Sequence, residues 1–269
     1  MRQVRIESST GLDLPTTGPI ADRALAARRA VAFSGAGLSK ESGLDTFRGP
    51  GGLWERMRPE ELATPQAFAR DPETVWGWYA WRWQQVAAAA PNPAHREIAR
   101  WERRFDSCRV VTQNVDGLHL AAGSSGVLEL HGTIAFARCS ACGRREPMAE
   151  AVLRSAQEPP RCPACGARLR PDVVWFGEQL PEGVFEAAAE AARAAHLFLA
   201  VGTSATVYPA AGLIEIAARS GALVIEVNVE PTPLSDLADV RLAGPAAEMV
   251  PALGRWLDRL VHASGRLRP

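Results

Sequence analysis

Residues 29–43 read RAVAFSGAGLSKESG and set the architecture of the whole chain. The apolar part, Arg29–Ser34, predicts a buried strand, and Gly35-Ala36-Gly37 predicts a tight turn into a short helix that ends near Gly43. Glycines let a backbone approach a ligand closely, and the start of a helix is positively polarised, so this geometry favours a phosphate site. A strand–helix turn without a ligand remains the alternative.

Outward from this stretch, apolar runs alternate with helical patterns. Further strands are predicted at Cys108–Thr112, Val127–Leu130, Leu197–Gly202 and Ala222–Asn228, and helices at Pro72–Ala90, Pro93–Arg104, Asp116–Ala122, Pro181–Ala195, Pro209–Ser220 and Pro245–Val261. This alternation predicts an α/β fold with a parallel sheet that helices cover on both faces. Ligands of such sheets bind beyond the carboxyl ends of the strands, where Gly202-Thr203-Ser204 and Asn228 stand.

The glycine turn departs from the G-x-G-x-x-G/A fingerprint of hydride-transferring dehydrogenases. Its third position is Lys40, and Glu55, near the distance of the expected ribose-binding acid, follows a glycine-rich loop rather than a strand. Three strand ends with suitable side chains therefore predict a dinucleotide site that does not belong to a dehydrogenase.

The cysteines predict a metal site. Cys139-x2-Cys142 and Cys162-x2-Cys165 are two knuckles, each followed by a glycine, and four thiolates complete a tetrahedron around one Zn²⁺. Because four cysteines leave no open coordination position, this zinc is expected to be structural. A redox pair is the alternative, and the fifth cysteine, Cys108, is expected to be a small buried residue.

Composition excludes several classes of protein. The 269 residues carry 30 basic and 30 acidic side chains, so the chain lacks a basic field for nucleic acid. No apolar run reaches the ~18 residues of a membrane helix, and no secretory signal is visible. We therefore expect a cytoplasmic protein with no nucleic-acid or membrane partner; its oligomeric state is not predicted.

Taken together, the motifs resemble the sirtuin family of NAD-dependent protein-lysine deacylases, in the family's order over about residues 29–260. Besides the paired cysteines, the matching stretches are GAGLSKESGLDTFRGPGGLW (35–54), VTQNVDGLH (111–119), LHGT (130–133), VVWFGE (173–178), GTSATVYPAAG (202–212) and EVNVEP (226–231).

The resemblance implies a Rossmann-like NAD-binding domain with an inserted small domain, which contains a zinc-ribbon module and helices. We expect an N-terminal extension at 1–25, the NAD-binding domain at 26–54, 105–136 and 170–265, the helical part of the small domain at 55–104, and the zinc module at 137–169. The active site is expected in the cleft between the two domains.

The resemblance also implies which residues hold NAD, the co-substrate. They are Gly35, Ala36, Gly37, Leu38, Ser39, Glu41, Thr46, Phe47, Arg48, Trp54, Gln113, Asn114, Val115, Asp116, Gly202, Thr203, Ser204, Asn228, Val229, Glu230 and Ala246.

His131, in LHGT, is implied as the catalytic base. In the family's reaction the acyl-lysine oxygen attacks the ribose carbon as nicotinamide leaves, and this histidine accepts a proton from a ribose hydroxyl. The products are nicotinamide, O-acyl-ADP-ribose and unmodified lysine. A histidine suits the step because its ordinary pKa, about 6.5, lies near working pH. The alternative is a structural histidine whose hydrogen bonds serve only to stabilise the fold.

Acylated lysine side chains of proteins are the implied partners, and Val174, Trp175, Phe176, Gly177 and Glu178 are implied to pair with the substrate backbone as an added strand. Tyr79-x-x-Arg82 resembles the mark of desuccinylase-type (class III) sirtuins. Both side chains lie on one helix face, so both can meet an acyl carboxylate.

Two further features agree with that branch. Ala63 matches the small residue that widens the acyl pocket. Asp45-Thr46 replaces the commoner Pro-Asp before Phe-Arg, as in bacterial members that remove acidic acyl groups. The expected substrates are succinyl, malonyl and acetyl lysine. Packing of Tyr79 in an aromatic stripe with a solvated Arg82 is the structural alternative.

Two other functions remain open at the level of the sequence. The same NAD pocket would serve a protein mono-ADP-ribosyltransferase, and a non-enzymatic NAD-binding adaptor could dock a partner through the zinc module. The presence of His131, Asn114 and Asp116 argues against the adaptor.

Overall fold

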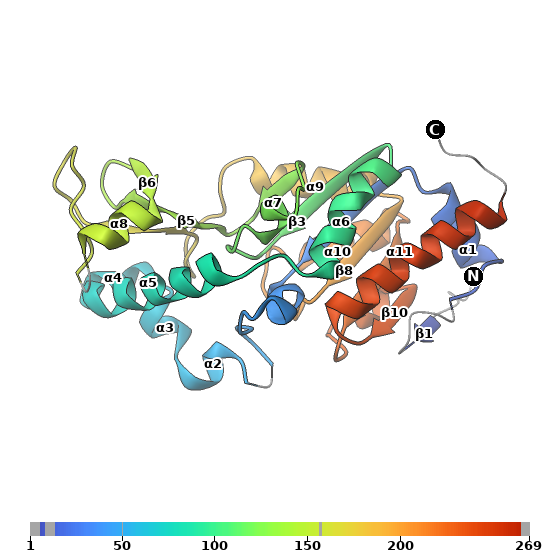
Figure 1. The fold of residues 1–269 in the computed structure, drawn as a ribbon, viewed down its shortest axis with the longest axis horizontal. Coiled ribbons are helices and arrows are strands. Elements are labelled where there is room, and N and C mark those ends of the chain that lie inside the picture. The colour runs from blue at the N-terminus through green and yellow to red at the C-terminus, as the bar shows by residue number, and fades with distance from the viewer. Residues whose placement is uncertain (1–5, 9–13, 50, 156–157, 265–269) are drawn as a thin grey trace.

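A seven-stranded, all-parallel sheet forms the centre of the large domain (Figure 1) in the computed structural model, which describes residues 6–8, 14–49, 51–155 and 158–264. The strand order is β1-β10-β9-β8-β2-β3-β4, and every neighbouring pair is parallel. The strands are β1 Ile6–Ser8, β2 Arg29–Ser34, β3 Ser107–Thr112, β4 Val127–Glu129, β8 Leu197–Val201, β9 Leu223–Asn228 and β10 Val240–Ala243.

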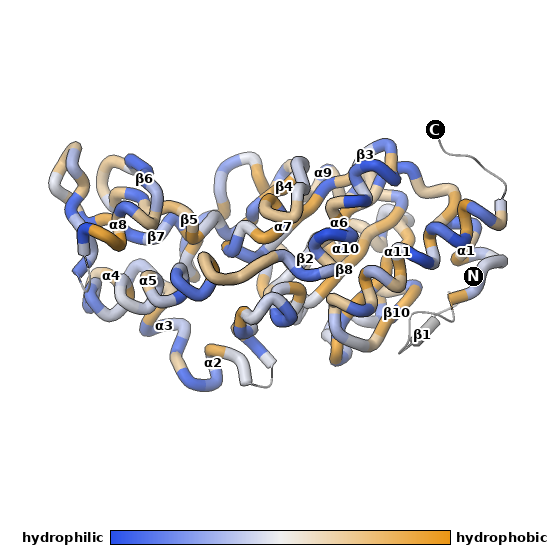
Figure 2. Tube along the Cα trace, in the orientation of Figure 1, coloured by the Kyte–Doolittle hydropathy of each residue, from blue (hydrophilic) through white to orange (hydrophobic). Residues whose placement is uncertain are grey.

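Helices cover both faces of this sheet, because the central strands are buried almost throughout. One core, around Trp101 and Trp256, lies between the sheet and α1, α6 and α11. The other, around Phe33 and Phe198, lies under α9 and α10. Figure 2 shows hydrophobic and hydrophilic residues alternating along α11, as a helix with one buried face requires. The helices are α1 Pro19–Ala26, α6 Pro93–Arg104, α7 Leu118–Ala121, α9 Val184–Ala194, α10 Gly212–Arg219 and α11 Ala246–Ala263.

The small domain lies at one end of the molecule (Figure 1). Its antiparallel sheet has the order β6-β5-β7 and shares one apolar core with the neighbouring helices, with Trp76, Trp78 and Met148 among the buried residues. Its elements are α2 Leu53–Arg56, α3 Pro59–Leu62, α4 Pro65–Arg70, α5 Pro72–Ala88, β5 Gly132–Cys139, β6 Arg145–Pro147, α8 Met148–Arg154 and β7 Leu169–Val173.

The expected fold class, a Rossmann-like sheet with a small inserted domain, is confirmed. Three details differ from the predicted ranges. Helix α6, expected in the small domain, packs in the large one, because its apolar stripe Ala94, Ile98 and Trp101 is buried with α11. Residues 132–136 and 170–173 pair in the small sheet rather than the large one.

The sequence interpretation missed two strands of the large sheet, β1 and β10, and β5 and β6 of the small sheet. β1 and β10 pair with each other at the sheet edge, Ile6 with Val240 and Ser8 with Leu242. The predicted N-terminal extension therefore contributes β1 and α1 to the large domain; its residues 1–5 and 9–13 lie outside the described residues. No described helix combines the length and the apolar character that a membrane crossing requires.

Candidate active site

One cavity of about 1210 Å³ opens where the carboxyl ends of β2, β3, β8 and β9 face the small domain. Each of these strands delivers a predicted residue to its wall. The predicted residues on the wall are Gly35, Ala36, Gly37, Glu41, Thr46, Phe47, Arg48, Trp54, Ala63, Tyr79, Gln113, Asn114, Val115, His131, Val174, Trp175, Phe176, Gly177, Glu178, Gly202, Thr203, Ser204, Asn228, Val229, Glu230 and Ala246.

Two glycine turns interlock at the base of this cavity. A Cβ on Gly35 would lie 2.8 Å from Gly202 O, and one on Gly37 would lie 2.8 Å from Gly202 Cα. Gly202 has φ 59°, and a Cβ on it would overlap Leu38 N and the backbone of Gly37, whose N–H donates to Gly202 O at 2.8 Å. These glycines are therefore required by contact between the two turns, in addition to the ligand approach that the sequence predicted.

The side chain of Ala36 lies between these glycines on the cavity wall. We expect Ala36→Leu to raise the KM for NAD roughly tenfold or more, because the larger side chain fills the space that the diphosphate needs. The melting temperature should stay within a few degrees of wild type, since Ala36 does not take part in the glycine contact. Initial rates against NAD concentration measure the effect; unchanged NAD kinetics would place the cofactor elsewhere.

Behind the wall, a hydrogen-bonded group of polar side chains supports the turn after β3. Asn114 Nδ2 donates to Gly35 O and Ser39 Oγ, at 3.1 and 3.2 Å, and Ser39 Oγ donates to Asp116 Oδ2 at 2.7 Å. Burial raises the pKa of Asp116, while hydrogen bonds from Leu118 N and Ser39 oppose the rise. Leu38, Ser39 and Asp116, predicted to contact NAD, thus form the layer beneath the wall.

Gln113 and Asn228 brace the turn after β8. Gln113 Nε2 donates to Thr203 Oγ1 at 2.8 Å, and Asn228 Nδ2 donates to Thr203 O at 2.9 Å. The turns of three strands are therefore tied to one another by side chains, which holds this part of the cavity in one shape.

His131 lies on the cavity wall with its ring orientation fixed. Its Nδ1 lies 3.0 Å from Gln113 O, and a carbonyl can only accept, so Nδ1 carries the proton and Nε2 keeps its lone pair. Burial lowers the pKa of His131, and the hydrogen bond to Gln113 O opposes the shift. The neutral ring at neutral pH is the form that can accept a proton.

Below the site, His119 is buried, with Nε2 2.9 Å from Ser34 Oγ and its ring against that of His95. Burial lowers the pKa of His119 to about 3. The interpretation of this histidine as a packing and hydrogen-bonding residue is confirmed. Cys108 is partly buried in β3 against the core of the large domain, and burial raises the pKa of its thiol to about 12, so the thiolate is disfavoured.

Phe47 and Trp54 hold the loop after the glycine turn. Their ring centroids lie 5.3 Å apart, and Trp54 N donates to Phe47 O at 3.0 Å. The guanidinium of Arg82 lies over the Phe47 ring at 5.4 Å and donates from Nη2 to Asp45 O at 2.9 Å.

The two residues of the predicted pair, Tyr79 and Arg82, therefore occupy different positions relative to the cavity. Both side chains are buried, at 6% exposure each, but only Tyr79 is on the cavity wall; Arg82 lies behind Phe47. The alternative prediction that Arg82 is solvated is wrong, because its side chain is buried within the protein. Burial lowers the pKa of Arg82, and the charges of Asp116 and Asp45 oppose the shift.

The segment Val173–Glu178 forms a further part of the cavity wall. Val174 N donates to His131 O at 2.9 Å, and Phe176 N donates to Ala63 O at 2.9 Å. This segment is therefore tied to the catalytic-base candidate on one side and to the small domain on the other.

The four cysteines gather away from the cavity. Their Sγ atoms all lie within 4.8 Å of one another, with 3.4 Å between Cys139 and Cys165 and 3.8 Å between Cys142 and Cys162. Zn–S bonds of about 2.3 Å give a tetrahedron with edges of about 3.8 Å, so the donor set fits Zn²⁺. None of the four lines the cavity, which agrees with a structural ion.

Further wall residues were not predicted, among them Lys40, Gly244, Tyr208 and the segment 179–183. Gly244 follows β10 directly, so recognising that short strand would have found it by the rule that picked the other strand ends. The segment 179–183 carries no motif beyond its position after VVWFGE.

Comparison with known proteins gives a consistent picture. A model of the Sir2 family matches residues 35–209. NAD-dependent protein deacylase 2 of Pyrobaculum aerophilum is 50% identical over 250 residues, 93% of this chain and 99% of the relative. An NAD-dependent protein deacylase of Thermus thermophilus is 55% identical over 226 residues, 82% of this chain and 87% of the relative.

Solved structures agree. A Sir2 homologue in complex with NAD superposes with a TM-score of 0.80 at 45% identity, covering 88% of this chain and 92% of that one. A Sir2 structure bound to a myristoylated histone peptide superposes with a TM-score of 0.75 at 36% identity, covering 92% and 97%.

Proposed function

This chain belongs to the Sir2 family and is an NAD-dependent protein deacylase, and from that premise we propose which acyl groups it removes and which residues act. The proposed substrates are lysines that carry succinyl or malonyl groups, with acetyl lysine as a further substrate. One observation carries the proposal: Tyr79 of α5 lies on the wall of the cavity that joins the glycine turns to His131, at the part we assign as its acyl end, and the buried Arg82 of the same helix lies directly behind Phe47 of that wall.

Bound NAD supplies a ribose carbon from which nicotinamide departs. Gly35, Ala36 and Gly37 hold the diphosphate, because their backbone forms the cavity base. Thr203 and Asn228 hold the adenosine half. Gln113 and Asn114 hold the nicotinamide side, and Asp116 supports Asn114 through Ser39 Oγ. His131 accepts a proton from a ribose hydroxyl at Nε2, since Nδ1 is committed to Gln113 O.

The peptide backbone binds beside Val173–Glu178 through the carbonyl groups of this segment. The N–H groups of Val174, Trp175 and Phe176 are already bonded, to His131 O, the Glu178 carboxylate and Ala63 O. An added peptide strand therefore donates its own N–H groups. Recognition by backbone pairing favours an enzyme that accepts many sequences around the acyl-lysine.

Tyr79 presents a donor to the acyl group. Trp175 Nε1 donates to Tyr79 OH at 3.0 Å, and an indole N–H can only donate, so the tyrosine oxygen accepts there and keeps its own hydrogen for a second bond. Burial raises the pKa of this hydroxyl above its usual value, so the hydrogen stays in place at every working pH.

Arg82 supplies the charge. In the absence of substrate its Nη2 donates to Asp45 O. We expect an acyl carboxylate to take that position, since a bidentate carboxylate is a stronger partner for a guanidinium than one carbonyl. Acetyl lysine has no carboxylate and leaves the Asp45 contact unchanged.

Arg82→Met should lower kcat/KM for succinyl-lysine roughly 100-fold, the size expected for loss of a charged, hydrogen-bonded pair. Activity on acetyl-lysine should change less than about threefold. Tyr79→Phe, a matched variant that removes one hydroxyl, should give a smaller loss in the same direction. Initial rates on one peptide with either acyl group measure both; equal losses on the two substrates would reduce the pair to packing.

Because Arg82 also supports the loop that carries Phe47, the KM for NAD is measured for each variant. A rise confined to NAD would assign Arg82 to the loop rather than to the acyl group. Wild-type protein that ignores succinyl-lysine but removes acetyl groups would leave plain deacetylation as the activity.

Mass spectrometry after incubation with NAD and acyl-peptides tests the reaction itself. Deacylation yields nicotinamide, O-acyl-ADP-ribose and unmodified lysine. Mono-ADP-ribosyl transfer would instead add mass to protein, and an adaptor would leave both reactants intact.

A further inference from the structure

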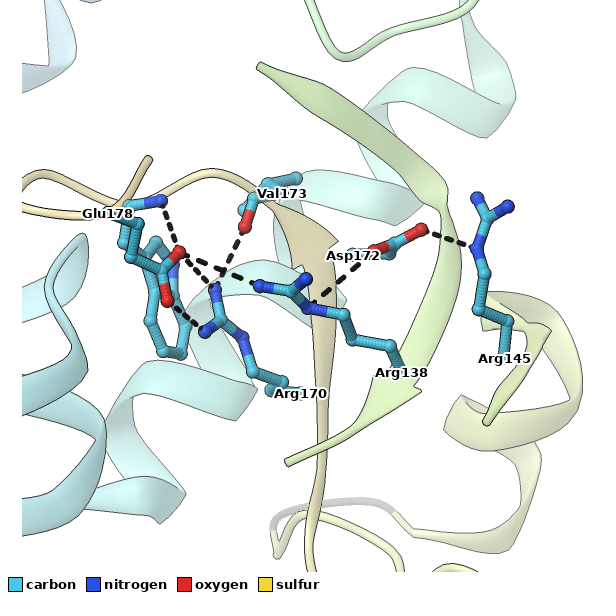
Figure 3. A network of polar contacts seen from close by, with 7 residues as sticks. Arg138, Arg145, Arg170, Asp172, Val173 and Glu178 are labelled. Carbon is cyan, nitrogen blue, oxygen red and sulfur yellow. Dashed lines mark hydrogen bonds and ion pairs between the residues drawn. The ribbon is translucent and has the colours of Figure 1, made fainter. Parts of the chain in front are cut away.

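The side chain of Arg170 packs against the segment Val173–Glu178. The residue lies on β7, directly before this segment, and is 7% exposed. Its Nη1 donates to Glu178 Oε1 at 2.5 Å, and its Nη2 donates to Glu178 Oε2 at 2.9 Å and to Val173 O at 2.8 Å (Figure 3). One guanidinium therefore ties the first and last residues of the segment together.

The same guanidinium fixes the residue at the middle of the segment. Its carbon lies 3.4 Å from the centroid of the Trp175 ring, and Glu178 Oε2 also accepts from Trp175 N at 2.8 Å. Trp175 Nε1 in turn donates to Tyr79 OH. A chain of contacts therefore runs from Arg170 through Trp175 to the hydroxyl at the acyl end of the cavity.

Arg170 and Glu178, whose paired side chains we call the clamp, remain charged at neutral pH. Burial alone would raise the pKa of Glu178, but hydrogen bonds from Arg170 and Trp175 N and the charges of Arg170 and Arg138 outweigh it, so the pKa lies below its usual value. Arg138 Nη2 lies 3.7 Å from Glu178 Oε2, and Arg138 Nε and Arg145 Nε face Asp172 (Figure 3).

We propose that Arg170 is a positioning residue for the acyl-peptide: its bidentate pair with Glu178 and its stack on Trp175 hold the segment in the conformation that binds the peptide backbone. A buried ion pair gives little net stability compared with apolar packing, but it fixes direction. The inference rests on the proposed function, because it concerns the peptide and acyl group of that reaction.

The segment touches the peptide and not the diphosphate end of the cavity. Loosening it should therefore raise the KM for acyl-peptide and leave the KM for NAD unchanged. A displacement of the order of 1 Å in a positioning element can cost about 100-fold, and here the loss should fall on kcat/KM for the acyl-peptide through its KM. A role in folding alone would lower the melting temperature and change both substrates together.

The experiment compares Arg170→Lys, Arg170→Met and Glu178→Gln with the control Arg145→Met. Lysine keeps the charge but cannot form the bidentate pair with Glu178 or stack on the Trp175 ring. Arg145 belongs to the same network, is more than half exposed and pairs with Asp172, which lies outside the segment. Zinc content, melting temperature, peptide anisotropy in the presence of ADP-ribose and steady-state rates are measured for each.

Arg170→Lys and Glu178→Gln should raise the peptide KM and the anisotropy Kd roughly tenfold or more, with kcat and the NAD KM within about twofold and one zinc retained. Arg170→Met should raise the peptide KM and Kd more than either of these variants, and Arg145→Met should have the wild-type KM and Kd. If Arg170→Met does not fold, the other two variants decide.

Unchanged peptide affinity in folded Arg170→Lys and Glu178→Gln would overturn the inference, as would equal losses for NAD and peptide. These outcomes differ from failure of the proposed function, in which wild-type protein would neither bind nor deacylate any acyl-peptide and the inference would fall with it.

Discussion

Replacing His131 by alanine should lower the rate of lysine deacylation at least about 100-fold, the usual effect of losing a positioned base, while NAD still binds. The ring nitrogen that faces the cavity is the unprotonated one, because Nδ1 is held by Gln113 O. Alanine removes this acceptor without disturbing the glycine turns. Steady-state rates on an acyl-peptide and NAD binding by calorimetry measure the two quantities.

The pH profile gives an independent check of this base. A base must be neutral to act, and burial lowers the pKa of His131, so activity falls only when the pH drops through that lowered pKa. The acid limb of kcat/KM for the acyl-peptide should therefore lie below about 6.5, the ordinary value for histidine. His196 offers a control, because it is half-buried directly before β8, at the amino end of the strands and so away from the cavity. His196→Ala should keep both the rate and the position of the acid limb. Near-normal turnover by His131→Ala would remove the histidine from the reaction.

Loss of the metal site should have the second large effect. Cys139→Ser or Cys162→Ser should give an aggregated or unfolded protein, and chelation of wild-type protein should lower its melting temperature. Structural zinc contributes folding free energy directly, and these two cysteines are part of the small domain's core. Metal analysis should find one zinc per chain.

Cys108→Ser is the matched control, since Cys108 lies in the large domain and outside the four-cysteine cluster. This variant should keep its zinc and its activity. A metal-free protein that remained folded and active would contradict the structural role of the ion.

The parts of the fold that local patterns determine were predictable. The strand and turn of residues 29–37 and the knuckle cysteines carry their conformation in their own residues. Helix α6 was assigned to the wrong domain because an amphipathic stripe predicts burial but not the partner, which here is α11, far along the chain. β10 was missed because four residues of mixed polarity, Val240–Ala243, give too little period to detect.

The site shows the same limit. Motifs predicted which residues meet at the cavity, but not their division into wall and support. That Ser39 and Asp116 lie behind Asn114, or that Arg82 is held by Asp45 O, depends on side-chain directions across three segments. The contacts of Arg170 with Glu178 and Trp175 could not be predicted either, because an arginine in a strand is ordinarily solvent-exposed and only the burial of this one against Trp175 distinguishes it.

The pairing of β1 with β10 has a consequence for synthesis. Once residue 173 has been translated, every strand of the zinc-bearing domain exists, whereas the large sheet still lacks β8, β9 and β10. At about 5–20 residues per second, the last of these strands follows several seconds later. The nascent chain can therefore assemble its four-cysteine metal site while the nucleotide end is still incomplete.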